Sequence, residues 1–200
     1  MNENQVKWLE DIIIACLITQ PNILSSKDGR SLSFTIEERK ERVLLDYIDR
    51  YQLNSNLYYD QQNHQCEIRP SIMLERILKE WLMNDLVTYL NPKHLRINTY
   101  LLWISLFGMK ARNGVMLQTT LGIEQQYTLS VLFKEQFQID LLQGGYFRII
   151  PFSPILFKAI QLNRSIEEIM ELSYMLPNKE KDSIKLLISE WEDERANYAY

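Results

Sequence analysis

Side chains that could do nucleophilic, redox or metal chemistry are few in this sequence of 200 residues. The two cysteines, Cys16 and Cys66, and the two histidines, His64 and His94, have spacings that fit neither a disulfide framework nor a zinc site. Cys16 lies in an apolar segment, where a buried small hydrophobic residue is expected. The sequence contains no Gly-rich phosphate loop, no G-x-S-x-G motif and no Cys-x-x-Cys motif. It therefore predicts no metal, no cofactor and no small-molecule substrate.

Charged side chains are distributed unevenly along the chain, whose formal net charge is −4 and whose pI is near 5.3. Residues 1–92 hold 10 basic and 14 acidic side chains, residues 93–164 hold 8 and 3, and residues 165–200 hold 4 and 9. The middle segment, with a net charge of +5, is able to face a polyanion, whereas the acidic flanks would repel one. The alternative is that each segment carries its own solvated face.

The composition, 46% hydrophobic and 24% charged, is typical of a folded globular chain. The longest apolar run, Ile12–Ile18, is far shorter than the ~20 residues that a membrane span needs. The N-terminus also lacks the basic region of a secretory signal. We therefore expect a cytoplasmic protein with no membrane contact.

The elements that position these side chains are predicted to occur twice. Each half has a hairpin dipeptide typical of type I′ turns, then a strand, an acidic helix start with an apolar helical face, and a second strand that ends at Pro. Chance repetition of similar units is the alternative. The corresponding segments are Asp28-Gly29 and Asn113-Gly114, Ser31–Leu53 and Met116–Ile139, and Glu67–Ser71 and Arg148–Ser153.

The periodicity of apolar residues predicts a mixed α/β (α+β) fold in which each half has the order α-β-β-α-β-β-α. The expected domains are residues 1–90, residues 91–164 and an acidic helical C-terminal extension, residues 165–200. The predicted helices are Gln5–Leu17, Glu37–Tyr51, Ser71–Asn84, Ile97–Phe107, Ile123–Phe137, Ser153–Leu162, Ser165–Leu176 and Glu180–Ala196, and the predicted strands are Asn22–Ser26, Arg30–Ile36, Asn56–Tyr59, Gln65–Arg69, Met109–Ala111, Val115–Thr120, Gln138–Leu142 and Tyr146–Ile150.

Tandem halves of this kind resemble the single-chain LAGLIDADG homing endonucleases. ACLITQPNI (Ala15–Ile23) and YLLWISLFG (Tyr100–Gly108) occupy the places of the family's two helical motifs, and Leu117 and Thr119 follow as its pattern requires. The resemblance covers roughly residues 5–162. It implies two pseudo-symmetric halves whose sheets form a saddle over duplex DNA.

The residues that carry catalysis in that family are replaced here. The resemblance implies that a carboxylate at the end of each motif holds a divalent metal against the scissile phosphates. The matching positions are Gln20 and Phe107, and the helix Ile97–Phe107 contains no Asp or Glu. An amide is a weak metal ligand and a phenyl ring is none. The expectation is a degenerate, catalytically inactive member of the family.

Candidate nucleic-acid-binding residues are polar or basic side chains on the expected outer faces of the strands and at the hairpin tips. Strand alternation places Ser31, Ser33 and Thr35 on the outer face of the first sheet. Side chains of these types reach base edges and phosphates. The candidates are Lys27, Arg30, Arg69, Lys110, Arg112, Gln118 and Arg148.

The leading functional hypothesis is a regulatory protein, linked to transcription or replication, that binds duplex DNA. The alternative is a protein-interaction adaptor on the same scaffold, whose partner binds the acidic C-terminal helices. These helices either pack on the core or cover the basic middle segment and inhibit it. An RNA-splicing maturase and an active nuclease are weaker possibilities, since the low pI opposes the first and the missing carboxylates oppose the second.

Overall fold

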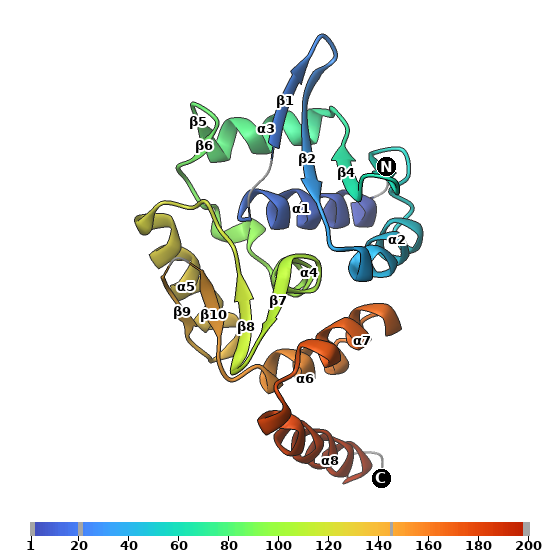
Figure 1. The fold of residues 1–200 in the computed structure, drawn as a ribbon, viewed down its shortest axis with the longest axis vertical. Helices are drawn as coiled ribbons and strands as arrows, with labels where there is room; N and C mark the ends of the chain where they lie inside the picture. The colour runs from blue at the N-terminus through green and yellow to red at the C-terminus, as the bar shows by residue number, and fades with distance from the viewer. Residues whose placement is uncertain (1–2, 20–21, 145, 198–200) are drawn as a thin grey trace.

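The computed structural model describes residues 3–19, 22–144 and 146–197, and the side chains of residues 194–197 lie outside the description. Helices and strands alternate through most of the chain (Figure 1). The helices are α1 (Glu3–Leu17), α2 (Glu41–Arg50), α3 (Ile72–Trp81), α4 (Ile97–Phe107), α5 (Ile123–Phe137), α6 (Ser153–Gln161), α7 (Ile166–Met175) and α8 (Lys181–Asn197), with 3-10 helices η1 (Glu38–Lys40), η2 (Pro92–His94) and η3 (Asn178–Glu180). The strands are β1 (Asn22–Ser26), β2 (Gly29–Thr35), β3 (Leu57–Asp60), β4 (Gln65–Ile68), β5 (Leu82–Met83), β6 (Leu86–Val87), β7 (Gly108–Ala111), β8 (Gly114–Leu117), β9 (Leu141–Leu142) and β10 (Phe147–Ile149).

Two four-stranded antiparallel sheets have the same strand order. The first is β1-β2-β4-β3 and the second is β7-β8-β10-β9. In each sheet the two central strands turn apolar residues toward the helices, with Leu32 and Phe34 in β2 and Val115 and Leu117 in β8. The expected mixed α/β class with antiparallel sheets is therefore confirmed.

The core between the sheets is formed by α1 and α4, which lie side by side. Nearly all of α4 is buried, and so is the run from Ile12 to Leu17 in α1, which explains why α4 and the C-terminal half of α1 are apolar all round, whereas the first turns of α1 are polar. At the C-terminal end of the pair, the Trp103 indole N–H donates to the Thr19 hydroxyl at 2.9 Å. At the beginning of α4, the Arg96 guanidinium lies 2.9 Å from the buried carboxylate of Asp11 in α1.

The hairpins form where the sequence predicts them, but the predicted turn type is wrong. The turn residues of β1–β2 are Lys27 and Asp28, and positive φ occurs only afterwards, at Gly29 (120°). The β7–β8 turn is built in the same way. A type I′ geometry needs two consecutive residues at positive φ, and it occurs instead in the β5–β6 hairpin, at Asn84 and Asp85. That hairpin lies in a segment for which the sequence indicated only a continuing helix and a linker.

The outer face of β2 also differs from the expectation. Thr35 is exposed, but Ser31 and Ser33 are buried. Both serines lie on a central strand opposite longer side chains, since Ser33 pairs with Asn22 and Glu67 and Ser31 pairs with Leu24. A short hydroxymethyl group between such neighbours is covered from both sides.

The last three helices pack behind the second sheet rather than over the strands. α7 contacts α2, α4, α6 and β7, and α8 packs on α6. Figure 1 shows α8 at the end of the molecule opposite to the β1–β2 hairpin. Among the described residues, no helix is both long and apolar enough to cross a membrane.

Candidate nucleic-acid interface

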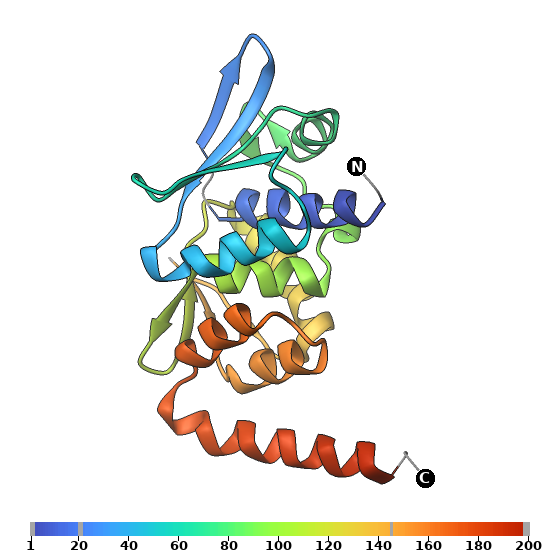
Figure 2. The ribbon, with the colours of Figure 1, turned by 90° about the vertical axis from the view of Figure 1, so that its right-hand side faces the viewer.

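The hairpins of the two sheets point toward one broad side of the molecule, which we call the open face, and η1 with the start of α2 lies between them on that side (Figure 2). Figure 2 shows the hairpins β1–β2, β3–β4 and β7–β8 toward one side and α1, α3 and α4 toward the other. Side chains on the open face follow from the pairing register. They include Thr35, Gln65, Asp60, Glu67 and Tyr58 in the first sheet and Met109, Met116, Arg148 and Leu142 in the second.

Two of the candidate residues meet at one hollow in the second sheet. Arg112, in the β7–β8 turn, and Arg148, in β10, both line a depression of about 250 Å³. Both side chains belong to exposed residues, and within the described chain neither enters an ion pair. Gly114 allows this arrangement, because a Cβ added there would collide with the Ile149 carbonyl oxygen. The hairpin therefore lies directly against β10.

The first sheet carries two further exposed cations, Lys27 in the β1–β2 turn and Arg69 directly after β4. The Arg69 guanidinium donates to the Ser55 carbonyl at 3.5 Å and lies 5.9 Å from the centre of the Tyr58 ring. The Glu67 carboxylate lies on the same face and lowers the local positive potential. Each sheet thus has one cation at a hairpin tip, Lys27 or Arg112, and one beside β4 or within β10, Arg69 or Arg148.

Two other candidates are engaged inside the protein. Arg30 forms an ion pair with Glu75 at 3.0 Å, and the Arg30 backbone N–H donates to the same carboxylate. The Lys110 ammonium donates to the Tyr174 carbonyl at 2.5 Å. Since Lys110 pairs with the inward-facing Val115, its side chain projects on the helix side of the sheet. Neither residue is free to hold a phosphate while it keeps these internal partners.

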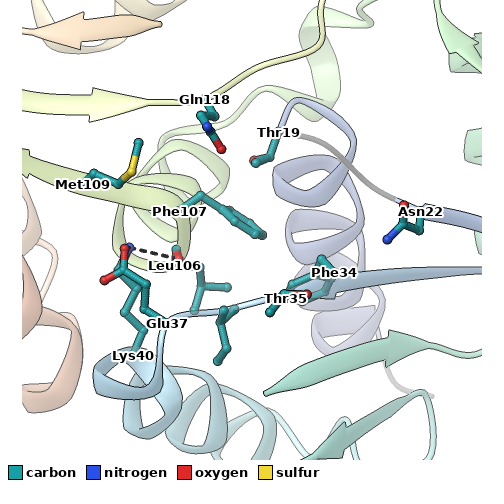
Figure 3. A pocket seen from close by; sticks show the side chains of 11 residues that line it. Thr19, Asn22, Phe34, Thr35, Glu37, Lys40, Leu106, Phe107, Met109 and Gln118 are labelled. Carbon is teal, nitrogen blue, oxygen red and sulfur yellow. Dashed lines mark hydrogen bonds and ion pairs between the residues drawn. The ribbon is translucent and has the colours of Figure 1, made fainter. Parts of the chain in front are cut away.

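Gln118 lines a different pocket, of about 300 Å³, between the ends of α1 and α4 (Figure 3). Thr19, Asn22 and Thr35 contribute polar atoms to the pocket wall, and Phe107 contributes a ring that lies 5.4 Å from the ring of Phe34. Phe107 is therefore part of an apolar contact between the halves. The other replaced position, Gln20, lies outside the described residues.

Lys40, which lines the same pocket, is not among the candidate residues that the sequence indicated. Its side chain is 1% exposed, and its ammonium donates to the Leu106 carbonyl at 3.1 Å and to the Gly108 carbonyl. It thus caps the C-terminal end of α4, where a cation is favourable. Burial lowers the Lys40 pKa to about 8, and the nearby Glu37 carboxylate opposes that shift. The position follows the acidic start of a predicted helix, which gave no signal of burial.

The pocket lining supplies one carboxylate, Glu37, which is ion-paired with Arg39 at 2.6 Å. No cluster of three or more His, Cys, Asp or Glu side chains within residues 3–19, 22–144 and 146–193 is arranged to hold a metal ion.

Comparisons with known proteins assign the chain to no family. No family model matches the chain, and no curated protein matches it. Among solved structures the chain is similar to full-length DUF199/WhiA from Thermatoga maritima, with a TM-score of 0.45 and 9% identity over 100% of this chain and 67% of that chain.

The assignment to the LAGLIDADG homing endonucleases is wrong. No family model supports it, and a solved structure to which the chain is similar bears the name DUF199/WhiA. The resemblance rested on a few apolar and glycine positions around two buried helices. Such positions are required wherever two apolar helices pack closely, so they do not identify a family.

Proposed function

We propose that this chain is a regulatory protein that binds duplex DNA through the open faces of its two sheets. The observation that carries the proposal is the meeting of Arg112 and Arg148 at one hollow. Guanidinium groups bind phosphate oxygens through paired N–H donors, and two of them on one depression suit a single backbone phosphate. Lys27 and Arg69 supply corresponding positive charges on the first sheet.

Neutral polar side chains between these cations provide the means to read bases. Thr35 and Gln65 are opposite each other in the first sheet, and Gln118 follows β8 in the second. Amide and hydroxyl groups of this kind bond to base edges in the major groove, while the cations fix the position on the backbone. The proposed role is binding without strand cleavage, because hydrolysis with two metal ions needs several carboxylates at one place.

The proposal is tested by fluorescence anisotropy with pooled random 30-mer duplex at ~50 and ~200 mM salt. We expect binding that weakens steeply with salt, because each phosphate contact releases about one counterion. The double variant Arg112→Ala/Arg148→Ala should bind about tenfold more weakly at the lower salt. Its salt slope should be shallower by about 0.9 for each phosphate that the variant no longer neutralises.

The matched control is Lys179→Ala/Lys181→Ala, which removes two exposed cations, in η3 and at the start of α8, away from the sheets. It should bind like the unaltered protein. Equal losses in the control and in Arg112→Ala/Arg148→Ala would show that only net charge matters. Absence of binding at either salt would reject the proposal and favour the alternative, a protein-interaction adaptor.

A further inference from the structure

A separate surface lies between α2 and α7, on the side that faces the viewer in Figure 2. It is a groove of about 950 Å³ whose apolar lining comes from Val43 and Leu45 of α2 and from Met170 and Tyr174 of α7. Val43 is buried and forms the floor, whereas the other three are exposed. None of these residues belongs to the proposed DNA interface.

The exposed apolar residues of α7 form a stripe along one helix face. Ile166, Met170 and Tyr174 follow one another at intervals of four residues and are 72%, 65% and 54% exposed. Eight residues of helix span about 12 Å, which is the length of two turns of a second helix laid alongside. Apolar residues at this spacing normally pack against a partner.

Tyr174, at the C-terminal end of the stripe, is held in place by contacts inside the protein. The Arg39 guanidinium lies 4.5 Å, and the Lys110 ammonium 4.6 Å, from the centre of the Tyr174 ring. The Arg39 guanidinium is in turn 2.8 Å from the Glu171 carboxylate of α7. An aromatic side chain fixed in this way loses little conformational entropy when a partner covers it. Tyr174 is thus suited to anchor an interface.

The rim of the groove is acidic. Glu38, Glu41 and Glu167 line it, and in the described part of the chain none of these carboxylates forms an ion pair or a hydrogen bond. Two cations, Arg39 and Arg42, also line the groove, but Arg39 is ion-paired with Glu37 at 2.6 Å and with Glu171 at 2.8 Å, so Arg42 is the cation that opposes the three free carboxylates. A second copy of this chain, with a net charge of −4, is disfavoured as the occupant for this reason, and so is nucleic acid.

We propose that the groove between α2 and α7 binds a basic amphipathic helix of a partner protein. Apolar side chains of the partner, spaced by four residues, cover the Ile166–Tyr174 stripe, and its Lys or Arg side chains meet the three rim carboxylates. This interaction surface is distinct from the DNA interface, so each can fail without the other.

The test uses a short helical peptide, labelled with fluorescein, with Leu at positions i, i+4 and i+8 and Lys on the flanks. It is titrated with the full chain in an anisotropy assay. We expect it to bind at least about tenfold more tightly than a scrambled peptide of the same composition, a difference of about 1.4 kcal/mol. Met170→Lys should weaken binding about tenfold, whereas Leu186→Lys, at a residue of α8 that is 60% exposed, should not.

A second pair of variants separates rim charge from net charge. Glu38→Lys/Glu41→Lys/Glu167→Lys should weaken binding of the peptide about tenfold. Glu190→Lys/Glu192→Lys/Asp193→Lys makes the same charge change on α8 and should leave binding unchanged. Circular dichroism checks that each variant is folded.

Three outcomes would overturn the proposal. The first is failure of the Lys peptide to bind, or equal binding of the scrambled peptide. The second is the same loss in both members of a variant pair. The third is self-association of the unaltered chain, measured by sedimentation velocity and abolished by Met170→Lys, since that result would make a second copy the occupant.

Discussion

Lys40 joins the two sheets through a single buried ammonium group. It follows β2 of the first sheet in the chain, and its partners are carbonyl groups at the end of α4 and the beginning of β7. Burial favours the neutral amine, and the Lys40 pKa is lowered to about 8 from an ordinary value of 10.5. The unfolded chain therefore binds more protons at this residue between pH 8 and 10.5, and stability rises with pH across that window.

The corresponding prediction compares the unaltered chain with Lys40→Met. The free energy of unfolding of the unaltered chain, relative to the variant, should rise by about 1–3 kcal/mol between pH 8 and 10.5, because each unit of pKa difference corresponds to about 1.4 kcal/mol. Urea denaturation at pH 7, 8, 9 and 10.5 measures this difference. A difference that stays constant with pH would contradict the assigned pKa shift.

The burial and the contacts of single side chains were harder to predict from the sequence than the helices and strands. Arg112 and Arg148 were identified as exposed basic residues, but their meeting depends on how the hairpin lies against β10. Ser31 and Ser33 look like surface residues in the pattern and are buried by their strand neighbours. The internal contacts of Arg30 and Lys110 come from helices distant in the sequence, which strand alternation does not reveal.

Elements were predicted far better, because apolar periodicity and capping signals are local. The predicted bounds of α4 and α5 are those observed, and β1 likewise. Errors occur where the local pattern is short. The β5–β6 hairpin was missed because its two strands have two residues each, too few for alternation to show. β9 and β10 are shorter than predicted for the same reason.

One element-scale prediction concerns the start of α7. The Ser165 hydroxyl accepts a hydrogen bond from the Glu168 backbone N–H at 3.1 Å, and the Glu168 carboxylate binds the Arg164 guanidinium at 2.6 Å. Ser165→Ala should lower the free energy of unfolding by about 1 kcal/mol. Ser173→Ala, at an exposed position in the same helix, is the control and should have no destabilising effect in thermal denaturation.

At the scale of the whole molecule, α1 and α4 form a core shared by both sheets. Besides the contact between Trp103 and Thr19, the Thr119 hydroxyl donates to the Ile18 carbonyl at 2.8 Å and the Thr120 backbone N–H donates to the Thr19 carbonyl at 3.0 Å. These bonds and the packing of α1 on α4 join residues 1–90 to residues 91–164. A core of this kind is expected to unfold cooperatively.

We predict a single urea transition, with coincident curves from tryptophan fluorescence and far-UV circular dichroism. Arg96→Met should destabilise the whole chain by about 3–5 kcal/mol, because it leaves the buried Asp11 carboxylate without its cation. Asp11→Leu/Arg96→Met removes both charges and should cost less than the single variant. Two separate transitions would show that the halves fold independently.

Because both cysteines are buried, the rate at which a thiol reagent labels each one reports how often the structure around it opens. Cys16 in α1 and Cys66 in β4 are fully covered, and burial raises the pKa of the Cys16 thiol and raises that of Cys66 to about 12. A thiol reagent therefore modifies neither side chain until the structure around it separates. Because one cysteine lies in the shared core and the other in the first sheet, their labelling rates distinguish detachment of that sheet from global unfolding in the native protein, without introducing a probe.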